Sequence, residues 1–241
     1  MKKIDWKILI VTSLLCLVPI VIGLRYYEAL PESVAIHFDI NNNPDNYWPK
    51  NAFVFGLPLM IVAIQILTSV IVDLNDKRKD ANKKMTLVSK LLLPIMSFVL
   101  YLATLGYALG NSLDIRKIAM CIIGIMFIVM GNYLPKTKGA SFVKGLKVED
   151  EELQNRLNKI AGYMFLIDGI LAIISIFFKP IFSIMVILLV MLESLVLEIW
   201  VCKKIKEKGD IPLKTKIRLI LITLVSIAIT ILCIFIFKGI V

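Results

Sequence analysis

Seven apolar runs divide this chain, and each is long enough to cross a membrane as a helix. A hydrocarbon core about 30 Å thick takes roughly 20 helical residues, and five of the runs contain no Asp, Glu, Lys or Arg. Lipid offers the backbone no hydrogen-bond partner, so each run is expected to be an α-helix. The predicted fold class is therefore all-α, a polytopic integral membrane protein of about seven transmembrane helices. The runs are Ile8–Leu24, Phe53–Val72, Leu91–Leu113, Ile118–Leu134, Ile160–Phe178, Ile181–Cys202 and Leu219–Phe237.

The net charge of +10 is explained by the way the basic residues are distributed. Of the 28 Lys and Arg residues, 22 fall in residues 1–7 and in the gaps 73–90, 135–159 and 203–218, which alternate with gaps that hold few. The positive-inside rule places such segments in the cytoplasm, which predicts an N-terminus inside and a C-terminus outside. The basic residues are then expected to contact membrane lipids with anionic head groups, and no direct binding of nucleic acid is expected.

The remaining composition indicates a bacterial cell (inner) membrane protein without a cofactor. Lys outnumbers Arg by 23 to 5, which is typical of an AT-rich bacterial genome. The four cysteines lie in or at the ends of apolar runs, so neither a disulfide framework nor a metal-binding spacing is expected. The sequence has no nucleophile-elbow motif, no His-Glu-x-x-His and no phosphate loop, so we do not expect an enzyme.

The loop of residues 25–52 is the part of the sequence most typical of a recognition surface. It lies on the predicted outer side, contains the single histidine of the chain, and carries four acidic against two basic residues, so it would attract a cationic peptide. Pro31 and Pro44 restrict its backbone, and Leu30–Phe38 is expected to include a short extended segment. The candidate ligand-binding residues are His37, Asp39, Asp45, Tyr47, Trp48 and Lys50.

Two interpretations of the histidine are open at this point. His37, Asp39 and Asp45 are a possible set of metal ligands, but their spacing is not diagnostic of any metal site, and none is predicted. In the other interpretation, His37 forms a hydrogen bond within the loop and Asp45 caps the turn or helix that follows.

The same loop resembles a known module. Its residues Leu30, Pro31, His37, Phe38, Asp39, Pro44, Asp45, Tyr47 and Lys50 match the short N-terminal domain of unknown function that precedes SdpI-type membrane regions, with Asn42 where that family usually has Gly. A second stretch, Gly131–Lys138, is similar to the Gly-Asn-Tyr-Leu-Pro-Lys segment of the SdpI region. The family's Arg-Thr-Pro-Trp-type segment is not found here, and Lys144–Val148 takes its place.

This resemblance implies an organisation and a function. Residues 1–72 would form a two-helix module carrying the outer loop, and residues 73–241 would form an SdpI-like helical region. The family theme implies immunity to a secreted antibacterial peptide, so the expected partner is a peptide toxin or envelope ligand at the outer loop. Some family members also hold a regulator at the membrane. Glu149–Lys159 is accordingly either a helix that recruits a cytoplasmic regulator or a simple extension of the fifth transmembrane helix.

Three carboxylates fall inside apolar runs: Asp168, Glu193 and Glu198. Counted from the turn near Lys179, Asp168 and Glu193 lie within roughly 3 Å of the same depth at 1.5 Å per residue. Ionisable side chains at depth are costly and are functional candidates by default. They indicate an intramembrane proton or cation site, and hence an ion- or proton-coupled transporter as an alternative function. The other interpretation is a protonated pair whose hydrogen bond joins the two helices.

Overall fold

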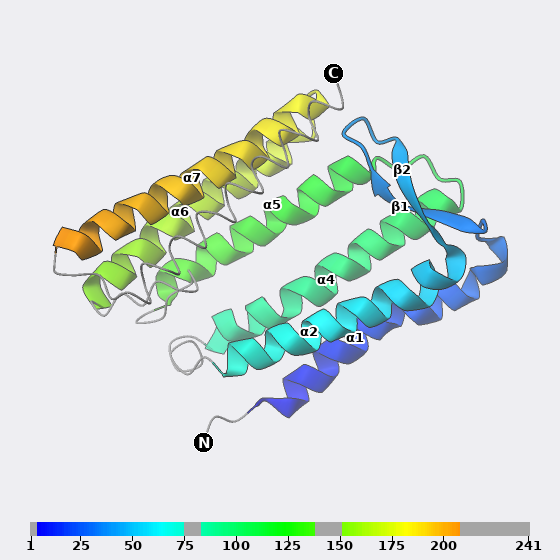
Figure 1. Ribbon diagram of the computed structural model, residues 1–241, viewed down its shortest axis with the longest axis horizontal. Coiled ribbons are helices and arrows are strands. Elements are labelled where there is room, and N and C mark those ends of the chain that lie inside the picture. Colours follow the sequence, from blue (N-terminus) through cyan, green and yellow to red (C-terminus); the bar gives the residue numbers. More distant parts are fainter. Residues whose placement is uncertain (1–3, 75–82, 138–150, 208–241) are drawn as a thin grey trace.

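The structure, a computed structural model, describes residues 4–74, 83–137 and 151–207 (Figure 1). Six of its helices are long and apolar enough to cross a membrane. This confirms the all-α polytopic fold, while the seventh apolar run, Leu219–Phe237, lies outside the described residues. The helices are α1 (Trp6–Arg25), α2 (Leu57–Asp73), α4 (Lys83–Ala108), α5 (Ile115–Tyr133), α6 (Glu151–Ser175) and α7 (Pro180–Glu207).

The outer loop folds into an antiparallel β-hairpin at one end of the helical bundle (Figure 1). It consists of a 3₁₀ turn η1 (Tyr27–Ala29), strand β1 (Ser33–Phe38) and strand β2 (Pro44–Pro49). The α4–α5 loop and the α6–α7 turn lie at this same end, which we call the hairpin end. A second 3₁₀ turn, η3 (Leu134–Lys136), follows α5 at the opposite end. The alternation agrees with the predicted topology, and the orientation relative to the cell stays a prediction.

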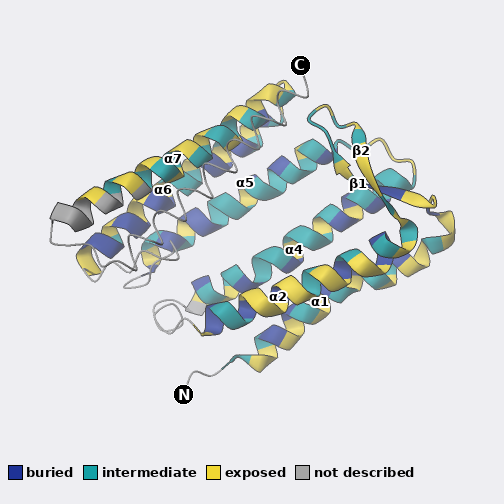
Figure 2. Ribbon diagram, viewed as in Figure 1, coloured by how far each residue is buried: buried dark blue, intermediate teal, exposed yellow. Residues whose placement is uncertain are grey.

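Much of the outward surface of the helices is exposed (yellow in Figure 2), and many of the exposed residues are large and apolar. Val21, Leu67 and Ile199 are 70%, 60% and 65% exposed, respectively, although each lies within a membrane-length helix. Exposed apolar surface on this scale marks contact with lipid or a partner rather than with water. The protein is therefore described as a multi-pass membrane protein.

The helices pack as two neighbouring groups joined through α4 and α5. Helices α1, α2 and α4 pack against one another, and α6 packs against both α5 and α7. Helix α4, which follows the predicted domain boundary at residue 72, thus packs with the helices that precede it. The division into residues 1–72 and 73–241 stays a prediction.

Helix α2 begins in an unusual way. A π-helical turn, η2 (Ala52–Gly56), precedes it and ends with the Leu57 N–H donating to the Ala52 carbonyl. Pro58 follows directly in the first turn of α2, where a residue without an N–H is tolerated. Such π turns occur often at functional sites, and this one connects the hairpin to the membrane.

Glycines allow α5 and α6 to approach closely. A Cβ added at Gly124 would lie 2.7 Å from the Gly169 carbonyl oxygen, and one added at Gly131 would lie 2.7 Å from the Gly162 carbonyl oxygen. The pairs run in opposite directions along the two helices and are seven residues apart on each. This is the small-residue packing expected between membrane helices, where close backbone approach takes the place of a hydrophobic driving force.

A buried ion pair joins α2 and α4 at the end opposite the hairpin. Lys90 Nζ donates to Asp73 Oδ1 at 2.7 Å, and the two side chains are 0% and 1% exposed. Asp73 Oδ2 also accepts the Asp5 N–H at 2.9 Å, so α1 is held by the same carboxylate. Helix α4 begins at Lys83, before the third apolar run, and so encloses Lys90.

Candidate functional site

The tip of the hairpin is a tight turn organised by Asp39. Its carboxylate accepts the Asn43 N–H at 2.7 Å and the Asn43 side-chain amide at 3.0 Å. These hydrogen bonds, the backbone one first, lower the pKa of Asp39 and keep it ionised. Asn42 adopts φ 67°, a left-handed conformation that Asn tolerates and Gly adopts freely. The turn therefore explains why Asn can stand where the resembling family has Gly.

His37 lies on the exposed side of the hairpin, beside an irregularity in the strand pairing. The register shifts on both sides of His37, which lies opposite Asn46. Irregularities of this kind commonly re-aim a side chain. Here His37 Nδ1 forms a hydrogen bond with Asp45 Oδ1 at 2.5 Å, with the two side chains 66% and 47% exposed. The geometry thus shows the hydrogen bond predicted for His37, with Asp45 as its partner, whereas the side chain that caps η2 is that of Asn51 rather than Asp45.

Apolar contacts fix the inner side of the hairpin to the bundle. Leu30 and Val34 are buried in one cluster with Phe53, Tyr101 and Leu105 from η2 and α4. The rings of Phe53 and Tyr101 stack with centroids 4.6 Å apart. This cluster places the hairpin directly on the helix ends.

Two further contacts join the hairpin to α4 and to the α4–α5 loop. Phe38 packs edge-on against Tyr107 with ring centroids 4.8 Å apart. The Asn42 amide donates to the Leu113 carbonyl at 2.9 Å and accepts the Ile115 N–H at 2.8 Å. The hairpin is therefore held at its base and at its tip, and its orientation is set by residues 71 and 73 positions away in the chain.

Lys50 has a role at the base of the hairpin. Its Nζ donates to Glu32 Oε1 at 2.8 Å and lies 5.0 Å from the centroid of the Tyr27 ring. The hydrogen bond to Glu32 raises the pKa of Lys50. Lys50 thus ties β2 to the segment before β1 and is not grouped with His37 and Asp45.

An open cleft of about 570 Å³ lies between the hairpin tip and the α4–α5 loop. Its lining residues include Asn42, Tyr107, Asn111, Ser112 and Asp114. Sequence analysis did not single out these residues, because a short loop between two apolar runs has no motif to mark it. The cleft is formed only when the hairpin folds back onto the loop.

Comparison with known families supports the importance of this region. Residues 14–62 match the family model described as Domain of unknown function (DUF1648). The match covers the second half of α1, the whole hairpin, η2 and the start of α2. The predicted resemblance of the outer loop to a domain of unknown function is thereby confirmed, and the SdpI assignment stays a prediction. Searches of curated proteins and of solved structures found no match.

The six predicted ligand-binding residues separate into two groups. His37, Asp45 and Tyr47 are exposed on the hairpin. Asp39 and Lys50 hold the hairpin together, and Trp48 is partly buried in β2, opposite Val34. No group of three His, Cys, Asp or Glu side chains that could hold a metal ion is found within the described part of the chain.

Substitution of Asn42 tests how the hairpin tip is held. Asn42→Gly removes the two hydrogen bonds to the α4–α5 loop, with an expected loss of about 1–3 kcal/mol of local stability. Asn42→Ala should cost about 1–2 kcal/mol more, because alanine disfavours the left-handed conformation. Limited proteolysis of the purified protein should therefore cut the hairpin fastest in Asn42→Ala and slowest in the wild type. The exposed neighbour provides the control, since Asn41→Ala should resist like the wild type. Equal resistance in Asn42→Ala would contradict this account.

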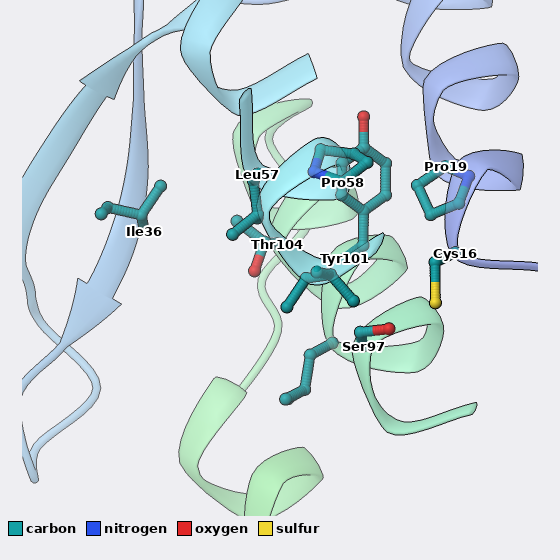
Figure 3. Close-up of a pocket in the computed structure, with 10 residues that line it drawn as sticks. Cys16, Pro19, Ile36, Leu57, Pro58, Ser97, Tyr101 and Thr104 are labelled. Carbon is teal, nitrogen blue, oxygen red and sulfur yellow. The ribbon is translucent and has the colours of Figure 1, made fainter. Parts of the chain in front are cut away.

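A second cavity, of about 210 Å³, lies beneath the hairpin between α1, α2 and α4 (Figure 3). Apolar side chains and a few polar groups line it, among them Cys16, Ser97, Tyr101 and Thr104. The Tyr101 hydroxyl is buried without a hydrogen-bond partner and lies beside Gly23, where a Cβ would collide with it. Ile36 of β1 lines this cavity together with residues of α1, α2 and α4.

The two predicted intramembrane carboxylates lie on facing helices, far from the hairpin. Asp168 on α6 is 1% exposed, and its Oδ1 has no hydrogen-bond partner. Glu193 on α7 likewise has a buried Oε2 without a partner. One oxygen of each carboxyl group thus has no partner, and the hydrogen bond between them stays a prediction.

Proposed function

We propose that this protein is an immunity or binding protein whose hairpin end recognises a secreted antibacterial peptide or a related envelope ligand. The observation that carries the proposal is that the hairpin has one face anchored to the helices and one exposed face. One face is fixed to the helices by Val34, Phe38 and Asn42, while His37 and Asp45 pair on the exposed face. A surface that is held rigid on one side and exposes polar side chains on the other loses little conformational entropy when it binds a ligand.

The charge of this surface favours a cationic ligand. The region from η1 to β2 carries Glu28, Glu32, Asp39 and Asp45, and its Lys50 is already paired with Glu32. A basic peptide would be steered toward such a surface. The exposed Tyr47 adds an aromatic group of the kind that is enriched at binding hot spots.

The cleft beside the hairpin tip gives such a peptide a place to enter. Asp114 on its rim already interacts with Arg116 and Lys117 at 3.5 Å, so a basic side chain from the ligand would have to compete with them. Tyr107 and Asn111 add hydrogen-bonding groups at the same place. We therefore assign the ligand to the exposed hairpin face and this adjoining cleft together.

The alternative function, in which Glu149–Lys159 recruits a cytoplasmic regulator, has weaker structural support. Helix α6 begins at Glu151, with Glu152 also in its first turn, as an extension of the transmembrane helix would. Leu153 and Leu157 are buried within the protein and are not free to bind a regulator. Glu149 and Asp150 lie outside the described residues, as does Lys144–Val148. The proposal includes no catalytic role.

A survival assay tests the proposed function. The full chain is expressed in a sensitive bacterium, which is exposed to peptide toxins from the culture fluid of the source organism and compared with an empty vector. His37→Ala and Asp45→Ala should each reduce protection by about tenfold, which corresponds to roughly 1.4 kcal/mol of binding free energy. The hairpin should stay folded, because neither side chain contributes to the buried cluster.

Two controls make the result interpretable. Glu151→Gln removes an exposed acidic charge at the start of α6, at the end opposite the hairpin, and should leave protection near the wild-type level. Membrane fractions must contain each variant in equal amount. Full protection by both His37→Ala and Asp45→Ala would refute a site on the exposed hairpin face.

A further inference from the structure

Helix α6 carries a stripe of buried polar side chains along its length. Gln154, Asn158, Asp168 and Ser175 are each no more than 4% exposed. Their spacings of four, ten and seven residues place them on one face of the helix. Burying a polar group is costly unless it forms a hydrogen bond. The hydrogen bonds of this stripe therefore show which of its side chains are left without a partner.

Both ends of the stripe are hydrogen-bonded. At the end opposite the hairpin, Gln154 donates to Asn158 at 3.1 Å, and Asn158 donates to the Thr137 carbonyl at 2.7 Å. At the hairpin end, the hydroxyls of Ser175 and Ser183 lie 3.1 Å apart. Arg116 Nη1 donates to Ser183 Oγ at 2.9 Å, which continues this network to α5.

The middle of the stripe is not hydrogen-bonded in the same way. Asp168 Oδ1 and Glu193 Oε2 are buried and have no partner. Ser175 lies opposite Ser183, so the antiparallel register of α6 and α7 places Asp168 opposite residue 190. Glu193 lies three residues further along α7, which is about 4.5 Å along the helix axis. One buried oxygen of each carboxyl group thus lacks a partner, and the two residues lie at similar depth on the packed helices α6 and α7.

Within the described residues, no basic side chain forms an ion pair with Asp168 or Glu193. Arg116 and Lys117 lie at the hairpin end of α5 and Lys179 in the α6–α7 turn, whereas Arg156 and Lys159 lie near the start of α6. The side chain of Glu198 is outside the described part of α7. The other charged or titratable residues on the packed elements are Cys121, Tyr133, Lys136, Glu151, Glu152, Tyr163, Cys202, Lys203, Lys204, Lys206 and Glu207.

We propose that Asp168 and Glu193 form an intramembrane site that takes up and releases one proton. Two carboxylates close together in a low-dielectric bundle cannot both ionise at low cost, so one proton is shared between them. A metal ion would want more ligands than two carboxyl groups, and the described residues place no third His, Cys, Asp or Glu beside this pair. The proposal is independent of the hairpin function, because neither residue lies at the hairpin.

Carbodiimide labelling of the full chain in native membranes tests the site. A protonated carboxyl group in an apolar setting adds its O–H across a C=N bond of dicyclohexylcarbodiimide, and the acyl group then shifts to nitrogen. The resulting N-acylurea keeps every atom of both reactants, so the peptide gains the mass of one reagent molecule. We expect this gain on Asp168 or Glu193, declining as the pH is raised and the shared proton is lost.

Matched variants separate the site from general reactivity. The double variant Asp168→Asn, Glu193→Gln should lose the labelling entirely, while Glu152→Gln, at an exposed position of the same helix, should label like the wild type. Unchanged protease resistance of the double variant shows that it is folded, since both replacements keep the side-chain shape.

Two results would overturn the proposal. One is the absence of labelling on both residues at acid pH, or labelling that does not change with pH. The other is suppression of labelling at constant pH by sodium chloride but not by choline chloride, which would identify an alkali cation as the occupant.

Discussion

Lys90→Met is expected to lower the free energy of unfolding by about 3–5 kcal/mol, the cost of breaking a buried ion pair by removing one partner. The substitution leaves Asp73 charged at 1% exposure, with the Asp5 N–H as its remaining hydrogen-bond donor in the structure. It also removes a contact between α2 and α4 at the end where α1 joins them. The loss should appear as unfolding at lower denaturant concentration in mixed micelles.

A double variant distinguishes loss of the pair from loss of packing. Asp73→Leu with Lys90→Met removes both charges, and such exchanges are often neutral or stabilising, so this variant should be more stable than Lys90→Met alone. Glu32→Gln serves as the control, because it breaks the Lys50 pair, whose carboxylate side chain is 87% exposed. Exposed pairs contribute about 0–1 kcal/mol. A Lys90→Met variant no less stable than Glu32→Gln would contradict the structure.

Gly169→Ala should lower stability by about 1–3 kcal/mol, the usual cost of inserting a methyl group into a tightly packed interface. The added Cβ would lie 2.6 Å from the Gly124 carbonyl oxygen and 2.9 Å from the Ile128 nitrogen. Both are backbone atoms of α5, so no side-chain rotation relieves the collision. The two helices would have to separate along their whole contact.

The same substitution elsewhere provides the control. Gly56→Ala places its Cβ 3.9 Å from that of Ala52, an ordinary contact, and should leave stability unchanged or slightly raised. Thermal denaturation in detergent, with helix content as the readout, compares the two variants directly. Equal midpoints for Gly169→Ala and Gly56→Ala would show that α5 and α6 do not approach as closely as described.

The fold could be predicted well from the sequence because its main constraint is local. A run such as Phe53–Val72 must be helical in lipid whatever surrounds it, since a helix satisfies the backbone hydrogen bonds within the segment. The extended character of Leu30–Phe38 was also predictable, and Ser33–Phe38 is β1. The start of α4 was not, because Lys90 looked like a charge at a helix end until Asp73 was found beside it.

The candidate site was predicted only in part. Its residue types were visible in the loop, but the pairing of His37 with Asp45 depends on a shifted register that no motif indicates. The importance of Asn42 was visible only as a departure from the family's glycine. Its two hydrogen bonds, to Leu113 and Ile115, became apparent only in the structure.

The sequence by itself determined that the chain crosses a membrane several times and that its longest outer loop is acidic, aromatic and rich in turn residues. These properties depend on composition and on short-range backbone chemistry. Only the tertiary structure decided that Asp73 and Lys90 form an ion pair and that α5 and α6 approach closely. The physical reason is that each of these contacts joins different helices, and their relative positions follow from packing rather than from any segment alone.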